Sequence, residues 1–273
     1  MPKRAILNFH LSPGSNPSWR KAFGEASRKE FQGSSSHQDC VGKSPSCCDF
    51  QVSTLRLEQS RPKGKDPMEP VIFCDFDGTI TNLDTIVFLT ENAGADPALR
   101  EQTLPKIVAG EWTVYEAIEM QMKNLHLSWQ EAVSLLTSKV HIDPSFEDFV
   151  KWAHGHRIPV KIVSSGMLPI IDLFIGHLNL EIYAHPVQVR RKGWRYTPDP
   201  EKMKVAVLQK ARKDYKPLIY VGDGTSDVCA LPFTDLVFAK RYLAEYCKEY
   251  EIPYFYFDNF TEVQSELCRG SII

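Results

Sequence analysis

The 273-residue chain lacks any Cys-x-x-Cys pair, and its seven cysteines are an odd number. Zinc sites commonly use Cys-x-x-Cys pairs and disulfide frameworks an even number of cysteines, so the sequence disfavours both and favours a reducing compartment. The chain also lacks an apolar run long enough to cross a membrane, and its start lacks the apolar segment of a secretory signal. We therefore expect a cytoplasmic protein with no membrane partner.

A surplus of charge of one sign is missing as well, because 32 Lys and Arg face 34 Asp and Glu and leave a net charge of -2. Proteins that bind nucleic acid usually carry a basic surplus, so we expect no nucleic-acid partner. The charge is unevenly distributed, since residues 1–68 carry 11 Lys and Arg against 6 Asp and Glu. A basic segment in front of an acidic body indicates two regions of different character.

Residues 1–67 are rich in Ser, Gly, Pro and Lys and have no sustained helical or strand period. Such a segment cannot bury enough apolar surface to offset the entropy of ordering, which predicts a disordered basic leader. Its Arg and Ser content also fits an organelle-targeting segment, but acidic residues such as Glu25 and Glu30 oppose this interpretation. We expect the disordered leader, followed by a folded domain over residues 68–273.

Short apolar runs alternate with helical patterns through this domain. Strands are predicted at residues 70–74, 159–163, 218–221, 236–239 and, more weakly, 253–257. Helices are predicted at residues 168–178, 202–213, 241–250 and 260–267. This alternation is typical of an α/β fold, a Rossmann-like parallel sheet with helices on both faces. Alternating residues at 187–196 predict a hairpin on the same sheet.

The interval from about 83 to 156 differs, because it contains amphipathic helical patterns and no strand pattern. Helices are predicted there at residues 114–122, 129–138 and 146–153. Three tryptophans recur within these stretches and are expected to pack in a core: Trp112, Trp129 and Trp152. A helical insert directly after the first strand is expected to form an all-helical cap over the carboxyl ends of the strands.

Carboxylates follow two of the predicted strands. Asp75-Phe76-Asp77-Gly78-Thr79 ends the first strand, and Gly222-Asp223-Gly224-Thr225-Ser226-Asp227 follows the strand at 218–221. Ligands of open α/β sheets bind outside the carboxyl ends of the strands, and Mg²⁺ prefers oxygen ligands. Each segment alone is also typical of an ordinary Asp-Gly turn. Two acidic strand ends in one sheet predict a metal site.

Val163-Ser164-Ser165-Gly166 ends another predicted strand, ahead of a helix. Hydroxyl and N–H groups in that position are typical of a phosphate cradle, although a simple helix N-cap has the same residues. Lys204 begins the helix that precedes the strand at 218–221. A lysine on a helix usually faces solvent, so its assignment depends on the other three segments.

The order of these four segments, over about residues 70–265, resembles the four motifs of the haloacid-dehalogenase superfamily. The helical insert resembles the C1 cap of subclass I, which includes phosphoserine phosphatase. Residues 80–84, 163–167 and 235–240 resemble the branch that contains the methionine-salvage 2-hydroxy-3-keto-5-methylthiopentenyl-1-phosphate phosphatase and related polyol phosphate phosphatases.

The resemblance implies a role for each motif residue. Asp75 becomes the nucleophile that forms an aspartyl-phosphate, and Asp77 the general acid and base. The implied cofactor is Mg²⁺, held by Asp75, the carbonyl group of Asp77 and Asp223, with Asp227 completing the acidic pocket. The implied phosphate-binding and supporting residues are Thr79, Ser164, Ser165 and Lys204, with Lys202 as the competing lysine.

Two positions bear on the substrate. Asp84 stands where phosphoserine phosphatases carry a Glu that binds the substrate amino group, so this candidate substrate contact is one methylene shorter. His185 lies where relatives often carry Asn and is either a substrate contact or a structural histidine. We expect a Mg²⁺-dependent phosphomonoester hydrolase whose partner is a small metabolite, a methylthio-ketose phosphate or a polyol or sugar phosphate. Phosphoserine phosphatase, phosphotransferase and non-catalytic phosphometabolite-binding module are the alternatives.

Overall fold

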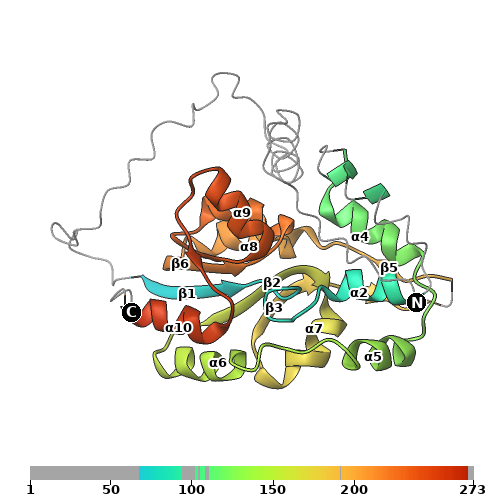
Figure 1. Cartoon of the computed structure of the whole chain (residues 1–273), viewed down its shortest axis with the longest axis horizontal. Coiled ribbons are helices and arrows are strands. Elements are labelled where there is room, and N and C mark those ends of the chain that lie inside the picture. Colours follow the sequence, from blue (N-terminus) through green and yellow to red (C-terminus); the bar gives the residue numbers. More distant parts are fainter. Residues whose placement is uncertain (1–67, 94–101, 104, 108–110, 191, 270–273) are drawn as a thin grey trace, which may run out of the picture.

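The computed structural model describes residues 68–93, 102–103, 105–107, 111–190 and 192–269, so the predicted leader lies outside the described residues. Six parallel strands form the central sheet in the order β3-β2-β1-β6-β7-β8 (Figure 1). The strands are β1 (Glu69–Cys74), β2 (Val160–Met167), β3 (Glu181–His185), β6 (Tyr215–Gly222), β7 (Leu236–Ala239) and β8 (Phe255–Tyr256). The predicted α/β fold is confirmed.

The chain builds one half of the sheet outward from β1 and then returns to place β6 against the other side of β1. Strands β1 and β6 pair in parallel, with Cys74 opposite Val221. The direction of winding therefore reverses between these two strands, and their carboxyl ends form the topological switch point where such sheets bind ligands.

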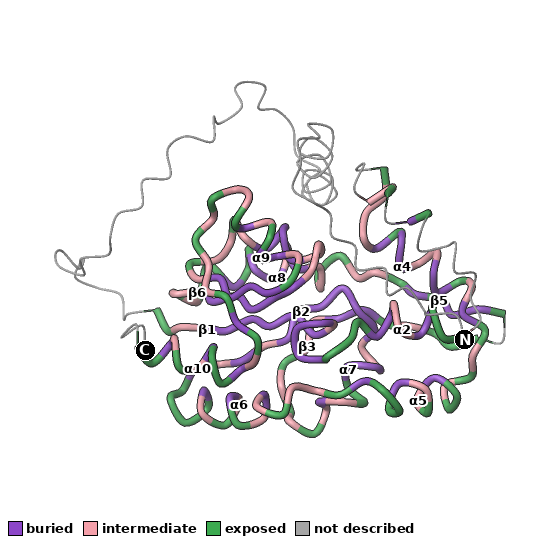
Figure 2. The backbone as a smooth tube through the Cα atoms, in the orientation of Figure 1, coloured by how far each residue is buried: buried purple, intermediate pink, exposed green. Residues whose placement is uncertain are grey.

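Alternate residues of the strands pack on opposite faces, as the period of two requires. Ile72 and Cys74 of β1 lie in the core formed with α6, α7 and α10, whereas Val71 and Phe73 face α8. These helices are α6 (Phe146–Gly155), α7 (Leu168–Ile175), α8 (Lys204–Ala211), α9 (Arg241–Glu249), which packs beside β7, and α10 (Phe260–Arg269). The strands run through the buried centre of the molecule (Figure 2).

A second hydrophobic core lies beyond the carboxyl ends of the strands. It joins α2 (Thr85–Asn92), α4 (Val114–Lys123) and α5 (Trp129–Thr137) through residues such as Leu89, Ile118 and Leu136. Helices α4 and α5 both begin with a capping box, formed by Thr113 with Glu116 and by Ser128 with Glu131. These helices form the part of the insert that stands over the strand ends.

The predicted hairpin forms, but its predicted place on the main sheet is wrong. Strands β4 (Val187–Gln188) and β5 (Arg195–Tyr196) pair with each other in a separate two-stranded sheet. Trp194 and Tyr196 are buried in the core of the insert, and the Trp194 N–H donates to the carbonyl of Met122 in α4 at 2.8 Å. This contact with the helices replaces pairing with the sheet.

Helix α6 falls inside the predicted insert but packs on the sheet. Phe146 and Phe149 are buried in the same core as Ile72, and the Phe146 ring lies 4.7 Å from that of Phe260 in α10. The group of described helices α2, α4 and α5 over the strand ends therefore finishes with α5.

The two connections between that group and the sheet run antiparallel, with Thr81 bridged to Ile142. The remaining described elements are the short 3₁₀ helices η1 (Gly176–Leu178), η2 (Pro200–Lys202) and η3 (Thr225–Phe233). Within the described ranges, no helix has both the length and the apolar character needed to span a bilayer.

Candidate active site

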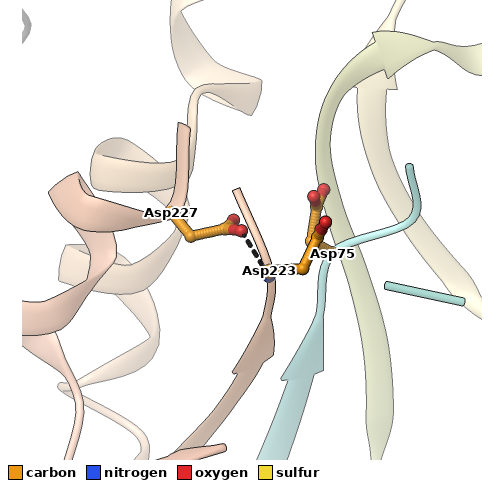
Figure 3. Close-up of side chains that lie close together, drawn as sticks. All are labelled: Asp75, Asp223 and Asp227. Carbon is orange, nitrogen blue, oxygen red and sulfur yellow. Dashed lines mark hydrogen bonds between the residues drawn. The ribbon is translucent and has the colours of Figure 1, made fainter. Parts of the chain in front are cut away.

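Three buried aspartates meet at the switch point (Figure 3). Asp75 directly follows β1 and Asp223 directly follows β6, while Asp227 comes from η3. One carboxylate oxygen from each lies within 4.8 Å of those of the other two. The parallel pairing of β1 with β6 thus brings together two acidic segments that are separated by almost 150 residues in the chain.

Asp227 is held by four hydrogen bonds. Its Oδ2 accepts from the backbone N–H groups of Asp223 at 2.9 Å and Gly224 at 2.8 Å. Its Oδ1 accepts from the Tyr220 hydroxyl at 2.6 Å and from Lys204 Nζ at 2.5 Å. Both oxygens are engaged with the protein, so Asp227 orients the loop that carries Asp223.

Lys204, the first residue of α8, is 1% exposed and lies with its Nζ 3.1 Å from Asp75 Oδ1. Burial alone would lower its pKa, but the neighbouring Asp227 and Asp75 outweigh burial and raise the pKa above its usual value. The competing Lys202 instead lies 3.9 Å from Asp199 and is half-exposed. The structure therefore brings Lys204, rather than Lys202, to Asp75.

Asp77 lies two residues beyond Asp75, against the backbone of β2. Its Oδ1 accepts hydrogen bonds from the N–H group of Thr85 at 2.8 Å and from the Thr85 hydroxyl at 2.6 Å. Burial and the nearby Asp84 raise its pKa to about 7, although the hydrogen bonds from Thr85 oppose this rise. A carboxyl group with this pKa exchanges a proton near neutral pH, as a general acid and base must.

Ser164 and Ser165 lie within β2, so the predicted end of this strand at residue 163 is wrong. The strand continues to Met167, and its register with β3 shifts between Val163 and Met167. Both serines are buried; Ser164 Oγ accepts from the N–H group of Gly166 at 2.9 Å. The irregular register, a feature that bulges produce near active sites, carries the serines past the regular part of the sheet.

Thr79 and Gly78 shape the turn after β1. The Thr79 hydroxyl donates to Asp223 Oδ1 at 2.8 Å and so links the two acidic segments. Gly78 has a φ of 76°, and a Cβ atom at this position would lie 2.4 Å from Asp223 Oδ2. The turn therefore requires glycine both for its backbone conformation and for the close approach of the carboxylate.

Four further residues hold the site and were not predicted to do so. Arg241 Nη1 donates to Asp223 Oδ2 at 3.2 Å, and Lys240 Nζ donates to the carbonyl of Thr79 at 3.0 Å. Both follow β7 directly, so their place after a parallel strand was a usable signal. Tyr220, which donates to Asp227, had a weaker sequence signal, a hydroxyl group in an otherwise apolar strand. Thr85 had no sequence signal, because only the turn after β1 brings it to Asp77.

Asp84 lies near Asp77 and helps to raise the pKa of that carboxyl group. Its Oδ1 accepts from the N–H group of Val87 at 2.9 Å and caps α2. His185, at the end of β3, is fully buried, and its Nδ1 accepts from the N–H group of Asp199 at 2.9 Å.

The carboxylates fit a divalent cation. Burial raises the pKa of Asp75 well above its usual range; Lys204 opposes this rise, and the neighbouring aspartates add to it. Burial and Asp227 likewise raise the pKa of Asp223, to about 6. Asp75 Oδ1 is buried and pairs with Lys204 Nζ at 3.1 Å. Clustered, buried carboxylate oxygens of this kind are the donor set that Mg²⁺ prefers.

A family model described as haloacid dehalogenase-like hydrolase matches residues 72–232. The polyol phosphate phosphatase PYP1 of Saccharomyces cerevisiae is 29% identical over 224 residues, 73% of this chain and 93% of that protein. The Pdp3-interacting factor 1 of Schizosaccharomyces pombe is 33% identical, over 72% of this chain and 94% of its own. A 2-hydroxy-3-keto-5-methylthiopentenyl-1-phosphate phosphatase of Bacillus cytotoxicus is 29% identical over the same shares.

Among solved structures, a substrate-bound phosphoserine phosphatase superposes with a TM-score of 0.60 at 18% identity. The likeness covers 74% of this chain and 99% of the phosphoserine phosphatase chain. At this identity the match supports the fold.

Proposed function

Because this chain belongs to the haloacid dehalogenase-like hydrolase family, we propose that it is a Mg²⁺-dependent phosphatase that hydrolyses a small phosphorylated metabolite through an aspartyl-phosphate. The observation that carries the proposal is the pairing of buried Asp75 with Lys204 at 3.1 Å, at the carboxyl end of β1. In this arrangement Asp75 is the nucleophile, the buried Lys204 is a ligand for phosphate, and Asp77, two residues beyond Asp75, is the acid.

The metal would be held by the carboxylates of Asp75 and Asp223 and by the backbone carbonyl of Asp77, with Asp227 fixing the loop. When bound, Mg²⁺ offsets the repulsion between carboxylate and phosphate and stabilises the charge of the transferred group. Thr79 supports this arrangement through its hydrogen bond to Asp223.

Asp75 attacks phosphorus, and the bond between its carboxylate oxygen and phosphorus forms as the bond to the leaving oxygen breaks. Asp77, whose pKa is raised to about 7 by burial and Asp84, gives its proton to the leaving oxygen and releases the alcohol. Water then attacks the same phosphorus and gives a proton back to Asp77. Inorganic phosphate leaves, and the carboxylate of Asp75 is restored.

Lys204 and the serines of β2 bind the non-bridging phosphate oxygens. The buried Lys204 has the charge for this task, since its pKa stays above its usual value beside Asp227 and Asp75. Ser164 supplies a hydroxyl group on the β2 side of Asp77, and Ser165 supplies backbone groups beside it. Positioning and electrostatic stabilisation of this kind are the main contributions of a protein to phosphoryl transfer.

The substrate class we propose is a methylthio-ketose phosphate or a polyol or sugar phosphate. The relatives named as polyol phosphate phosphatase and as methylthiopentenyl phosphate phosphatase, each 29% identical, support this class. Asp84 also supports this class, because it is one methylene shorter than the Glu with which phosphoserine phosphatases bind the amino group of their substrate.

The test is hydrolysis of p-nitrophenyl phosphate by the purified full chain with Mg²⁺ or with EDTA. We expect phosphate release only with Mg²⁺, and a loss of at least about 10³-fold in kcat for Asp75→Asn, because the nucleophile is removed. Asp172→Asn, on the exposed side of α7, is the matched control and should keep wild-type activity.

Full activity of Asp75→Asn would refute the assigned nucleophile. A panel of phosphorylated metabolites, run with and without a polyol acceptor, then separates hydrolysis from phosphotransfer. Binding of a metabolite without turnover of any substrate would leave only the non-catalytic module.

A further inference from the structure

His185 has an environment that the steps above do not explain. It is the last residue of β3, where it pairs in register with Met167 at the end of β2. The residue is 0% exposed and lies where the sheet meets the insert. A histidine buried this deeply normally has hydrogen-bond partners at both ring nitrogens.

Only one ring nitrogen of His185 has a partner among the described residues. Nδ1 accepts from the N–H group of Asp199 at 2.9 Å, so the proton of the neutral ring is on Nε2. Nε2 is buried and has no hydrogen-bond partner in the described part of the chain. A buried donor left without an acceptor costs about 1–3 kcal/mol, so its presence points to an acceptor that arrives with a ligand.

The ring is a neutral donor rather than a cation at physiological pH. Burial lowers the pKa of His185 to about 4; Asp199 opposes this shift, and Lys202 and Lys204 add to it. A neutral N–H group can donate to a hydroxyl or carbonyl oxygen of a ligand without adding a charge of its own.

The surroundings of His185 connect it to the phosphate-binding strand. The ring of Tyr115 in α4 meets it edge-on at 5.1 Å, and that of Tyr196 in β5 does so at 5.6 Å. The Tyr196 hydroxyl donates to the carbonyl of Ser165 at 2.7 Å, and Asp77 is close enough to add to the raised pKa of Tyr196. The two tyrosines therefore flank the imidazole on the insert side of the proposed phosphate site.

We infer that His185 is a specificity-determining residue, which donates from Nε2 to an uncharged hydroxyl or carbonyl oxygen of the leaving group. The inference rests on the proposed phosphatase function and deepens it. In this proposal phosphate binds at Asp75, Ser164 and Lys204, and the leaving group lies on the insert side of that site, where Tyr115 and Tyr196 contact His185. An oxygen on the leaving group satisfies the buried donor, whereas an aliphatic chain leaves it unpaired.

Two substitutions separate the donor from the structural contact of the ring. His185→Asn keeps an acceptor near the position of Nδ1 for the N–H group of Asp199 but removes the Nε2–H donor. His185→Gln places an amide N–H group near the position of Nε2 but removes the acceptor at Nδ1. His154→Asn, on the exposed side of α6, is the matched control.

The measurement is the ratio of kcat/KM for glucitol 6-phosphate to that for n-hexyl phosphate, which has the same carbon chain without hydroxyl groups. We expect the wild type and His154→Asn to prefer the polyol phosphate, and His185→Asn to lose about 10-fold of that preference, the value of one hydrogen bond. His185→Gln should retain part of it. Urea unfolding midpoints verify that each variant is folded.

An unchanged ratio in His185→Asn would overturn the inference. A ratio that is lost in His185→Gln but kept in His185→Asn would also overturn it, because the acceptor at Nδ1, a structural contact, would then be what matters. The proposed function fails separately. It fails if the wild type hydrolyses neither these substrates nor p-nitrophenyl phosphate, and the specificity role of His185 falls with it.

Discussion

At the scale of single residues, the site depends on short contacts between side chains and glycine backbone. A Cβ atom on Gly166 would lie 2.5 Å from Asp77 Oδ2 and 3.1 Å from Ser164 Oγ. Real Cβ contacts are longer, so the carboxyl group of Asp77 holds its position only because β2 has no side chain at this point. The position of the Asp77 carboxyl group, the proposed general acid, therefore depends on the lack of a side chain at Gly166.

We predict that Gly166→Ala lowers kcat/KM for p-nitrophenyl phosphate by about 10- to 100-fold, because a displacement of the reacting group by about 1 Å has an effect of this size. Stability should change little, since the displaced atoms are the ends of side chains. Gly155→Ala is the matched control, because a Cβ atom there would have no neighbour within 4 Å. Equal activity of both variants, with equal urea midpoints, would contradict this view of Gly166.

At the scale of elements, the insert has a core of its own, and Trp194 of the β4–β5 hairpin closes it. Trp194 is 1% exposed, and its Nε1–H group donates to the carbonyl of Leu127 at 2.7 Å. Its ring lies 6.1 Å from that of Trp129 in α5. A residue from well beyond the insert in the sequence thus completes the packing of its helices.

We predict that Trp194→Ala destabilises the insert by about 3–5 kcal/mol, the usual cost of removing a large buried aromatic side chain. Hydrogen exchange should show lost protection in α4 and α5, with β1 and β6 unchanged, because those strands belong to a different core. Trp152→Ala is the comparison: its partly buried ring packs in the core of the sheet, so the loss should move to α6 and α10. Uniform loss of protection in both variants would mean that the two cores unfold together.

The elements that were predictable from sequence are those whose pattern is local. The apolar runs at 70–74 and 218–221 form β1 and β6, and their order explains why Asp75 and Asp223 meet. The resemblance to the haloacid-dehalogenase superfamily, which rests on the same short motifs, is also confirmed.

What could not be predicted depends on distant partners. The hairpin at 187–196 has a strand pattern, but its place on the insert is decided by the contacts of Trp194 with α4 and α5. Likewise, the helical pattern at 146–153 does not reveal whether its apolar side meets the insert or the sheet. The position of Arg241 after β7 places it near the site, but its hydrogen bonds to Asp223 and to the carbonyl of Asn82 depend on partners far away in the chain.

At the scale of the whole molecule, the fold concentrates negative charge at its switch point. Burial raises the pKa of Asp77 from 3.8 to about 7 and that of Asp223 from 3.8 to about 6, with Asp84 and Asp227 adding to these shifts respectively. At a pH between 3.8 and these raised pKa values, the two carboxyl groups bind more protons in the native protein than in the unfolded chain. These two carboxyl groups therefore lower the free energy of unfolding of the metal-free protein as pH rises from about 4 to about 7, while the lowered pKa of His185 acts in the opposite direction.

We predict that urea unfolding in EDTA shows this fall, and that Mg²⁺ reverses it, because a cation bound only by the native state stabilises the native state. The gain from Mg²⁺ should be larger at about pH 7.5, where the carboxylates are ionised, than at about pH 5, where protons compete with the metal. Asp223→Asn should lose most of the Mg²⁺ effect and reduce the pH dependence, which Asp77 still contributes, whereas the exposed Asp172→Asn should keep both unchanged. A gain from Mg²⁺ that is the same at both pH values, or is retained in Asp223→Asn, would show that the ion binds outside this carboxylate cluster.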